Sequence, residues 1–159
     1  MATQVTNTTG ALSYFTNLDG DTDDHRIIGE FGSILTETGA DRHTASGIAW
    51  QLAPTSATHT ALLPLKFSIG KLACKASTAV TVKAWMKRTN TGITGKLVVK
   101  GGQLAGVPSD VTDTITAGAD TWEQLSVNFT PTEQGVIEIS AEVYGGTTYS
   151  VFVDDMEIS

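Results

Sequence analysis

Strict alternation of apolar and polar side chains from residue 78 to residue 88 constrains the fold of this chain most. The apolar side chains of one parity are Val80, Val82, Ala84 and Met86. A period of two is typical of a β-strand that buries one face. The pattern predicts a strand in which Trp85 lies beside Lys83 and Lys87 on the polar face.

Similar segments recur along the rest of the chain, with turn residues between them. They cover residues 46–53, 61–69, 95–100, 111–116, 122–129, 136–144 and 149–158, and residues 27–35 also favour a strand. Residues 111–116 are predicted to be a short edge strand. The turn at 89–92 is predicted to pair strand 78–88 with 95–100, and Gly145-Gly146 to close a hairpin. Short strands at this spacing predict an all-β sandwich or barrel.

Length and composition fit one domain. The chain has 159 residues, and threonine, which suits a pleated surface better than a helix, is its commonest residue. Residues 1–11 are small, polar and Thr-rich, and we expect a flexible arm that orders only against a partner. Residues 12–159 are expected to form a single domain.

Charge and targeting features exclude several classes of function. The net charge of −7 repels phosphate backbones, which argues against nucleic-acid binding. No stretch is long and apolar enough for a membrane span, and the N-terminus lacks the pattern of a signal peptide. The sequence therefore predicts a protein made in a cytoplasm. Cys74 is the only cysteine, and we expect a buried, unreactive thiol.

The C-terminal third carries a resemblance to a known class of domains. The segments are Thr121-Trp122-Glu123-Gln124-Leu125, Phe129-Thr130-Pro131-Thr132, Gly135-Val136-Ile137-Glu138-Ile139 and Val151 to Ile158. In this order they resemble the closing half of the jelly-roll carbohydrate-binding modules, also called galactose-binding-like domains. The resemblance covers residues 45–159 and implies a jelly-roll β-sandwich of two antiparallel sheets. Residues 122–155 are most similar to such modules in virion structural proteins of tailed bacteriophages.

Two groups of acidic residues are candidates for a structural calcium site. Asp19, Asp21, Asp23 and Glu30 have the spacing of a calcium loop. The sixth position, however, is Asp24 where that loop needs glycine, so a solvated acidic loop is the alternative. The resemblance implies a second candidate on the last strand, at Asp154 or Asp155. Alternation places Asp154 with Phe152, Met156 and Ile158; if that face is the core, Asp154 needs a metal or hydrogen-bond donors.

The three tryptophans are candidates for contact with a sugar ring. Trp50 is in line with Ile48 and Leu52, which predicts burial, and the resemblance implies that Trp122 is a core anchor. Trp85, with Lys83 and Lys87, is therefore the candidate for contact with a ligand or partner. His25, His43 and His59 lack zinc-ligand intervals and are predicted to be surface loop residues.

Nothing in the sequence predicts catalysis. The chain has no Gly-X-Ser-X-Gly elbow, phosphate loop or dinucleotide fingerprint, so no catalytic residue and no required cofactor are predicted. Asp154 and Asp155 are adjacent on a predicted strand, where successive side chains point to opposite faces. They are therefore not expected to flank one glycosidic bond as a catalytic pair.

Two non-enzymatic functions follow from these features. The first is a bacteriophage head decoration (cement) protein on the virion surface, bound to the major capsid protein or another virion protein. The resemblance implies a homotrimer for such a protein. The alternative is a carbohydrate-binding module that recognises a glycan through a sheet face or loops. The two could coexist, with weak glycan binding by a virion protein.

Overall fold

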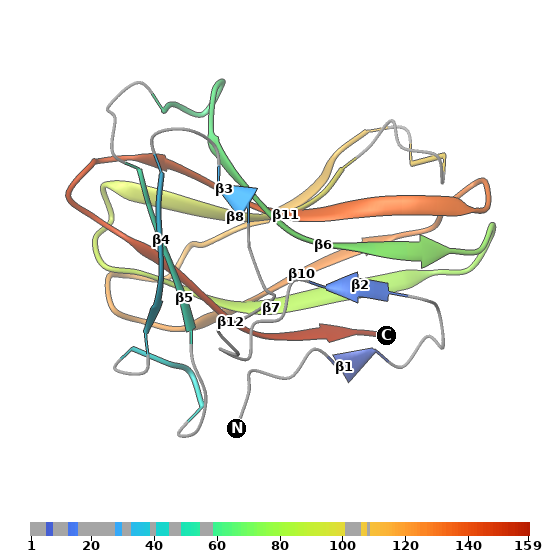
Figure 1. Cartoon of the computed structure of the whole chain (residues 1–159), viewed down its shortest axis with the longest axis horizontal. Helices are drawn as coiled ribbons and strands as arrows, with labels where there is room; N and C mark the ends of the chain where they lie inside the picture. Colours follow the sequence, from blue (N-terminus) through green and yellow to red (C-terminus); the bar gives the residue numbers. More distant parts are fainter. Residues whose placement is uncertain are drawn as a thin grey trace.

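All regular elements among the described residues are β-strands. The computed structural model describes residues 6–7, 13–15, 28–29, 33–38, 41–44, 49–54, 59–100, 106–107 and 109–159. The strands form two layers, which Figure 1 shows one above the other. The architecture is a jelly-roll β-sandwich, as the sequence predicts. Among these residues, no helix has the length and hydropathy to cross a membrane.

The lower layer in Figure 1, sheet A, has the order β10-β7-β12-β5-β4, and β1 pairs with β12. Its strands are β1 (Thr6–Asn7), β4 (Ser33–Thr38), β5 (Ala49–Pro54), β7 (Val80–Arg88), β10 (Glu123–Phe129) and β12 (Val151–Ile158). All pairs are antiparallel except β1 with β12, which is parallel. The predicted arm therefore contributes two residues to this sheet, and its other residues lie outside the described ranges.

The upper layer, sheet B, has the order β2-β6-β11-β8-β9, and β3 pairs with β6. In the view of Figure 1 its edge strand β2 overlaps the lower layer. Its strands are β2 (Ser13–Phe15), β3 (Ile28–Gly29), β6 (Leu65–Cys74), β8 (Ile93–Val99), β9 (Val111–Thr114) and β11 (Gly135–Gly145). All of its pairs are antiparallel. The edge position of β9 confirms the prediction for residues 111–116.

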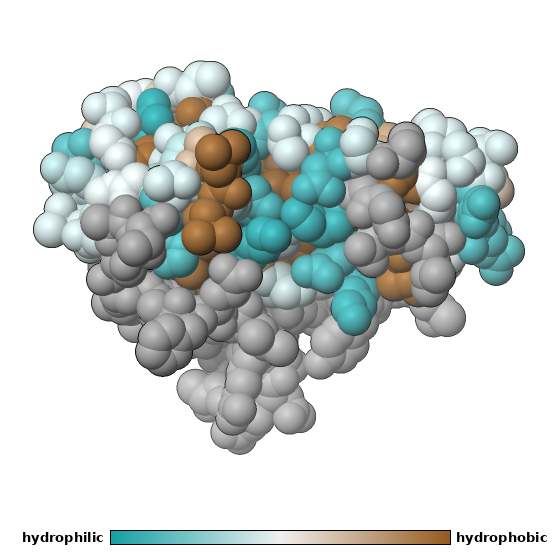
Figure 2. Space-filling view, turned by 90° about the horizontal axis from the view of Figure 1, so that it is seen from above, coloured by the Kyte–Doolittle hydropathy of each residue, from teal (hydrophilic) through white to brown (hydrophobic). Residues whose placement is uncertain are grey.

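The core lies between the sheets and follows the predicted alternation. Val80, Val82, Ala84 and Met86 of β7 are at most 4% exposed and belong to one apolar cluster with Phe67 and Trp50. Seen from the side of sheet B, polar residues cover most of the described surface and leave small apolar patches (Figure 2). The burial of Trp50, at 5% exposure, confirms its predicted place.

Both predicted hairpins are wrong. Strand β7 pairs with β10 and β12, whereas β8 pairs with β11 and β9, so the turn after Arg88 crosses between the sheets. The chain crosses again at Gly145, between β11 and β12. A turn signal marks a reversal of the chain, but it does not determine whether the next strand stays in the same sheet.

Strand β6 begins and ends later than predicted. The strand expected over residues 61–69 lies instead at Leu65–Cys74, so it continues through Gly70. Gly70 pairs with Ile139, and the ladder between β6 and β11 shifts register immediately after this pair. Glycine inside a strand is typical of a β-bulge, so here it marks an irregularity and not an end.

Candidate functional site

The outer face of sheet A carries an aromatic and charged surface. Lys83, Trp85 and Lys87 alternate with the core residues of β7 and therefore lie on this outer face, as predicted. Trp122 immediately precedes β10, with the same parity as Gln124, which pairs with Trp85. Alternation thus brings two tryptophans and a lysine together at one end of β7 and β10.

A short segment outside the strands, Asp41–Thr44, lies against this surface. The His43 ring stacks on Trp85 with a centroid distance of 3.9 Å and an angle of 15° between the ring planes. Trp122 meets the same imidazole edge-on, at 5.7 Å and 70°. His43 therefore contacts both tryptophans.

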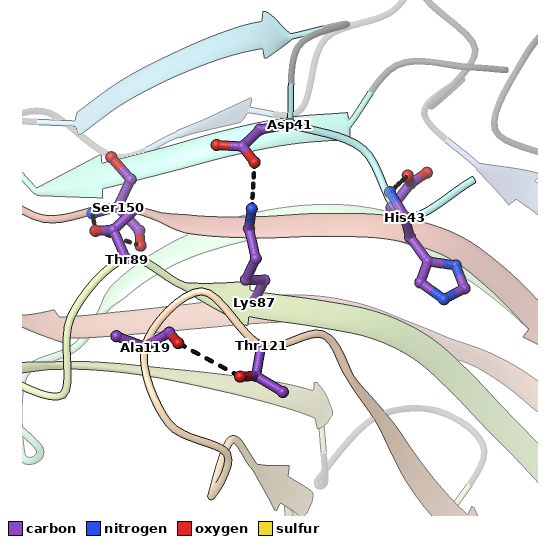
Figure 3. A network of polar contacts seen from close by, with 8 residues as sticks. Asp41, His43, Lys87, Thr89, Ala119, Thr121 and Ser150 are labelled. Atoms are coloured by element: carbon purple, nitrogen blue, oxygen red, sulfur yellow. Dashed lines mark hydrogen bonds and ion pairs between the residues drawn. The ribbon is translucent and has the colours of Figure 1, made fainter. Parts of the chain in front are cut away.

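Lys87 is the buried cation of the site, only 5% exposed. Its ammonium pairs with the Asp41 carboxylate, and Figure 3 shows the two side chains pointing toward each other. The same nitrogen lies 4.9 Å from the Phe152 ring centroid and 5.3 Å from that of Trp122. A buried charge needs such partners, since ion pairing and aromatic faces offset its desolvation.

Asp154 and Asp155 attach the Asp41–Thr44 segment to β12. The His43 amide donates to Asp154 Oδ2 at 2.8 Å, and the Asp155 amide donates to Asp154 Oδ1 at 2.8 Å. The carboxylate of Asp155 lies 2.9 Å from His43 Nδ1. Asp154 is 0% exposed, and these two amide donors supply hydrogen bonds that offset the cost of burying its charge.

The predicted grouping of Asp154 with Phe152 holds, but its grouping with Met156 and Ile158 is wrong, because β12 contains a bulge. The register against β7 shifts between Asp154 and Met156, and Asp155 takes a φ of 41°. One extra residue reverses the alternation. Phe152 and Asp154 therefore lie on the outer face, while Val151, Val153, Met156 and Ile158 lie in the core.

The predicted calcium residues are only partly within the described structure. Asp19, Asp21, Asp23 and Glu30 lie outside the described residues. Across the described ranges, no group of three or more His, Cys, Asp and Glu side chains could hold a metal ion. Calcium binding therefore stays a prediction.

Three other residues add to the description of the site. Lys83 lies on the same face as Trp85 and forms an ion pair with Glu157 at 3.7 Å.

Trp122, predicted as a core anchor, is half-buried outside the core cluster. The signal was present in the sequence, since Trp122 shares its parity with Gln124, Ser126 and Asn128. His43 was expected to be an ordinary surface loop residue, and no local pattern indicated its distant partners.

The pKa values of two other groups, Cys74 and Lys100, are shifted by their structural surroundings. Burial raises the pKa of the Cys74 thiol to about 11, which keeps it protonated and unreactive near neutral pH. Burial by itself would lower the pKa of Lys100, but hydrogen bonds to Asp110 and Glu142 raise it above its ordinary value. Both groups lie away from the Trp85 surface, on the strands of sheet B or at their ends.

Comparison with solved structures identifies the fold. A family 61 carbohydrate-binding module in complex with β-1,4-galactotriose is 18% identical, with a TM-score of 0.55 over 84% of this chain and 86% of that one. A family 16 carbohydrate-binding module has 15% identity and a TM-score of 0.58, over 81% and 87%. A xylan-binding domain from Paenibacillus barcinonensis has 14% identity and a TM-score of 0.54, over 98% and 96%.

A phage protein is also among the similar structures. The enzymatically active domain of tailspike protein 4 from bacteriophage CBA120 is 13% identical, with a TM-score of 0.53 over 81% of this chain but only 19% of that one. No protein-family model matches the sequence, and no curated protein matches it. The structural comparisons therefore show that this chain has the jelly-roll fold of the carbohydrate-binding modules.

Proposed function

We propose that this protein is a carbohydrate-binding module without catalytic activity, and that its glycan binds on the outer face of sheet A. The observation that carries the proposal is the pair Trp85 and Trp122 beside the buried cation Lys87. Sugar rings stack on indole faces, while charged and polar groups nearby orient their hydroxyls. The similar solved structures that are described as binding galactotriose or xylan support this choice.

The geometry favours binding over bond cleavage. The Asp154 carboxylate accepts hydrogen bonds from two backbone amides, and Asp155 is engaged with His43. Carboxylates held in this way serve to position a segment of the chain. A glycosidase instead needs two carboxyl groups that flank the scissile bond from opposite sides.

The test is a glycan-binding screen followed by calorimetry on tryptophan variants. The screen includes β-1,4-galactotriose and xylohexaose, and the variants are Trp85→Ala and Trp122→Ala. We expect each variant to bind at least about fivefold more weakly, since stacking on an aromatic ring contributes about 1 kcal/mol or more. Tyr144→Ala is the matched control, because Tyr144 is a half-buried aromatic residue of sheet B. Equal losses in all three variants would contradict the proposed site.

A second candidate function is a structural module of a phage particle, either a head decoration protein or a virion-surface domain. The similarity to a tailspike domain supports it, together with the sequence resemblance. In this role the chain would bind the major capsid protein or another virion protein, as a homotrimer on the virion surface. Light scattering with calcium and then with chelator tests the trimer and the proposed calcium together. A monomer under both conditions that also fails to bind capsids would exclude this role.

A further inference from the structure

The two groups best suited to hold a glycan already have occupants from the same chain. The imidazole of His43 covers a face of the Trp85 indole, at 3.9 Å and nearly parallel. A sugar ring stacks on an indole in the same way, so it cannot share that face with the imidazole. The carboxylate of Asp41 is paired with Lys87, where an acceptor oxygen of a ligand would otherwise bind.

The segment that carries both occupants contacts side chains of β7 and β12 and belongs to no β-ladder. None of the residues Asp41–Thr44 lies in a strand. Its contacts include the Asp41–Lys87 pair, which Figure 3 shows, and the bonds from His43 to Asp154 and Asp155. The Asp41 side chain is 46% exposed and that of His43 25% exposed, whereas the Lys87 side chain beneath them is only 6% exposed. None of the strand pairings of β7 and β12 includes this segment, so its departure would break none of them.

We propose that the Asp41–Thr44 segment is an internal competitor, which must leave the Trp85 and Lys87 surface before a glycan binds there. This inference rests on the proposed glycan-binding function. Displacement exposes the covered Trp85 face and frees the Lys87 ammonium next to the rings of Trp122 and Phe152. A sugar ring then replaces the imidazole, and a sugar oxygen replaces the Asp41 carboxylate. A glycan and the Asp41–Thr44 segment therefore cannot occupy the Trp85 and Lys87 surface at the same time.

Substitution of His43 should have opposite effects on glycan affinity in the two cases: it strengthens binding if His43 is a competitor and weakens it if His43 contacts the glycan. If only the open state binds, the apparent affinity is reduced by the fraction of molecules that are open. The variant His43→Ala loses the stack and the contact with Asp155, so it should bind β-1,4-galactotriose or xylohexaose about tenfold more tightly than the unmodified protein. His59→Ala, a histidine substitution in the loop before β6, is the matched control and should leave the affinity unchanged. Weaker or unchanged binding by His43→Ala would overturn the inference.

Nuclear magnetic resonance follows the displacement directly. The indole ring current should shift the His43 imidazole protons upfield in the free protein, and the chain has only three histidines, so assignment by the His43→Ala spectrum is direct. Saturation with the oligosaccharide should move these resonances back toward those of an exposed imidazole. If they stay upfield at saturation, His43 remains stacked and the inference is wrong.

A measurement without any glycan tests whether the segment covers Trp85. In a Trp122→Phe background, the remaining tryptophans are the core residue Trp50 and Trp85. Adding His43→Ala should increase the quenching of tryptophan fluorescence by acrylamide, and no increase would overturn the inference. If the quenching increases but no sugar binds to any form, the proposed function fails and the inference fails with it. If the sugar binds through Trp85 while His43 stays stacked, only the inference fails.

Discussion

The carboxylate of Glu123 stabilises the connection between β9 and β10. Its Oε2 atom accepts hydrogen bonds from the Thr116 and Ala117 amides at 2.7 and 2.8 Å, and Oε1 accepts one from the Thr116 hydroxyl at 2.7 Å. Glu123 begins β10, so one side chain connects this strand with the residues that follow β9. The substitution Glu123→Ala removes all three bonds.

The cost of Glu123→Ala follows from the exposure of the groups left behind. Thr116 is exposed, so water replaces most of what its amide and hydroxyl lose, which leaves about 0.5 kcal/mol. Ala117 is half-buried, and its amide loses a charged acceptor worth about 1.5 kcal/mol. We therefore expect the free energy of unfolding to fall by about 2 kcal/mol. For a chain of 159 residues this corresponds to a melting temperature lower by about 6 °C.

Urea denaturation followed by circular dichroism measures this change. Glu133→Ala is the control, since Glu133 is an exposed glutamate in the turn before β11, and it should change stability by less than about 0.5 kcal/mol. Glu123→Gln keeps one carbonyl acceptor and should fall between the two. A loss below about 0.5 kcal/mol for Glu123→Ala would show that water satisfies all three donors and would refute the reasoning.

The same contacts predict a pH dependence. Burial by itself raises the pKa of Glu123, but the hydrogen bonds from Ala117 and Thr116, together with the charge of Arg88, lower it below the ordinary value of 4.5. A carboxyl group with a lowered pKa stabilises the fold above its unfolded pKa and loses this contribution as the pH falls through the folded value. The stability difference between the unmodified protein and Glu123→Ala should therefore be constant near neutral pH and shrink below about pH 4.5.

Three further predictions concern the core and the turns. Gly145 has a φ of 117°, and a Cβ there would lie 2.3 Å from the Gly92 carbonyl oxygen, so Gly145→Ala should cost at least about 3 kcal/mol in urea denaturation. Gly118→Ala, which meets nothing within 4 Å, is its control. Phe67→Ala should cost about 3–5 kcal/mol in the same assay, because Phe67 is 0% exposed. Cys74 should react with a thiol reagent at pH 8 only after unfolding, since its pKa is about 11; rapid reaction in the native state would contradict this.

Period-two patterning predicted the strands and most of their faces. The clearest case is β7, where Val80, Val82, Ala84 and Met86 are buried in the expected order. Trp85 and Lys87 accordingly lie on the opposite face. This part of the structure is local, because successive side chains of any strand alternate between its two faces.

Contacts between distant segments were decided only by the tertiary structure. His43 and Asp155 are 112 residues apart, and the Lys87–Asp41 pair joins residues 46 apart. Neither pairing leaves a periodic trace in the sequence, because each depends on where a segment outside the strands comes to lie. The candidate site therefore needed the folded chain, although Trp85 was identified from its strand alone.

The sheet to which each strand belongs, and the bulge of β12, were also decided only by the tertiary structure. The sequence by itself determined that the chain is an all-β sandwich with Trp85, Lys83 and Lys87 on one outer face. It did not determine that β7 and β8 lie in different sheets, because a turn of the same length can connect strands within a sheet or between sheets. Nor did it show the extra residue at Asp155, which puts Asp154 on the outer face beside His43 while Met156 and Ile158 lie in the core. A bulge adds one residue without changing composition or periodicity on either side, so only the pairing of β12 with β7 reveals it.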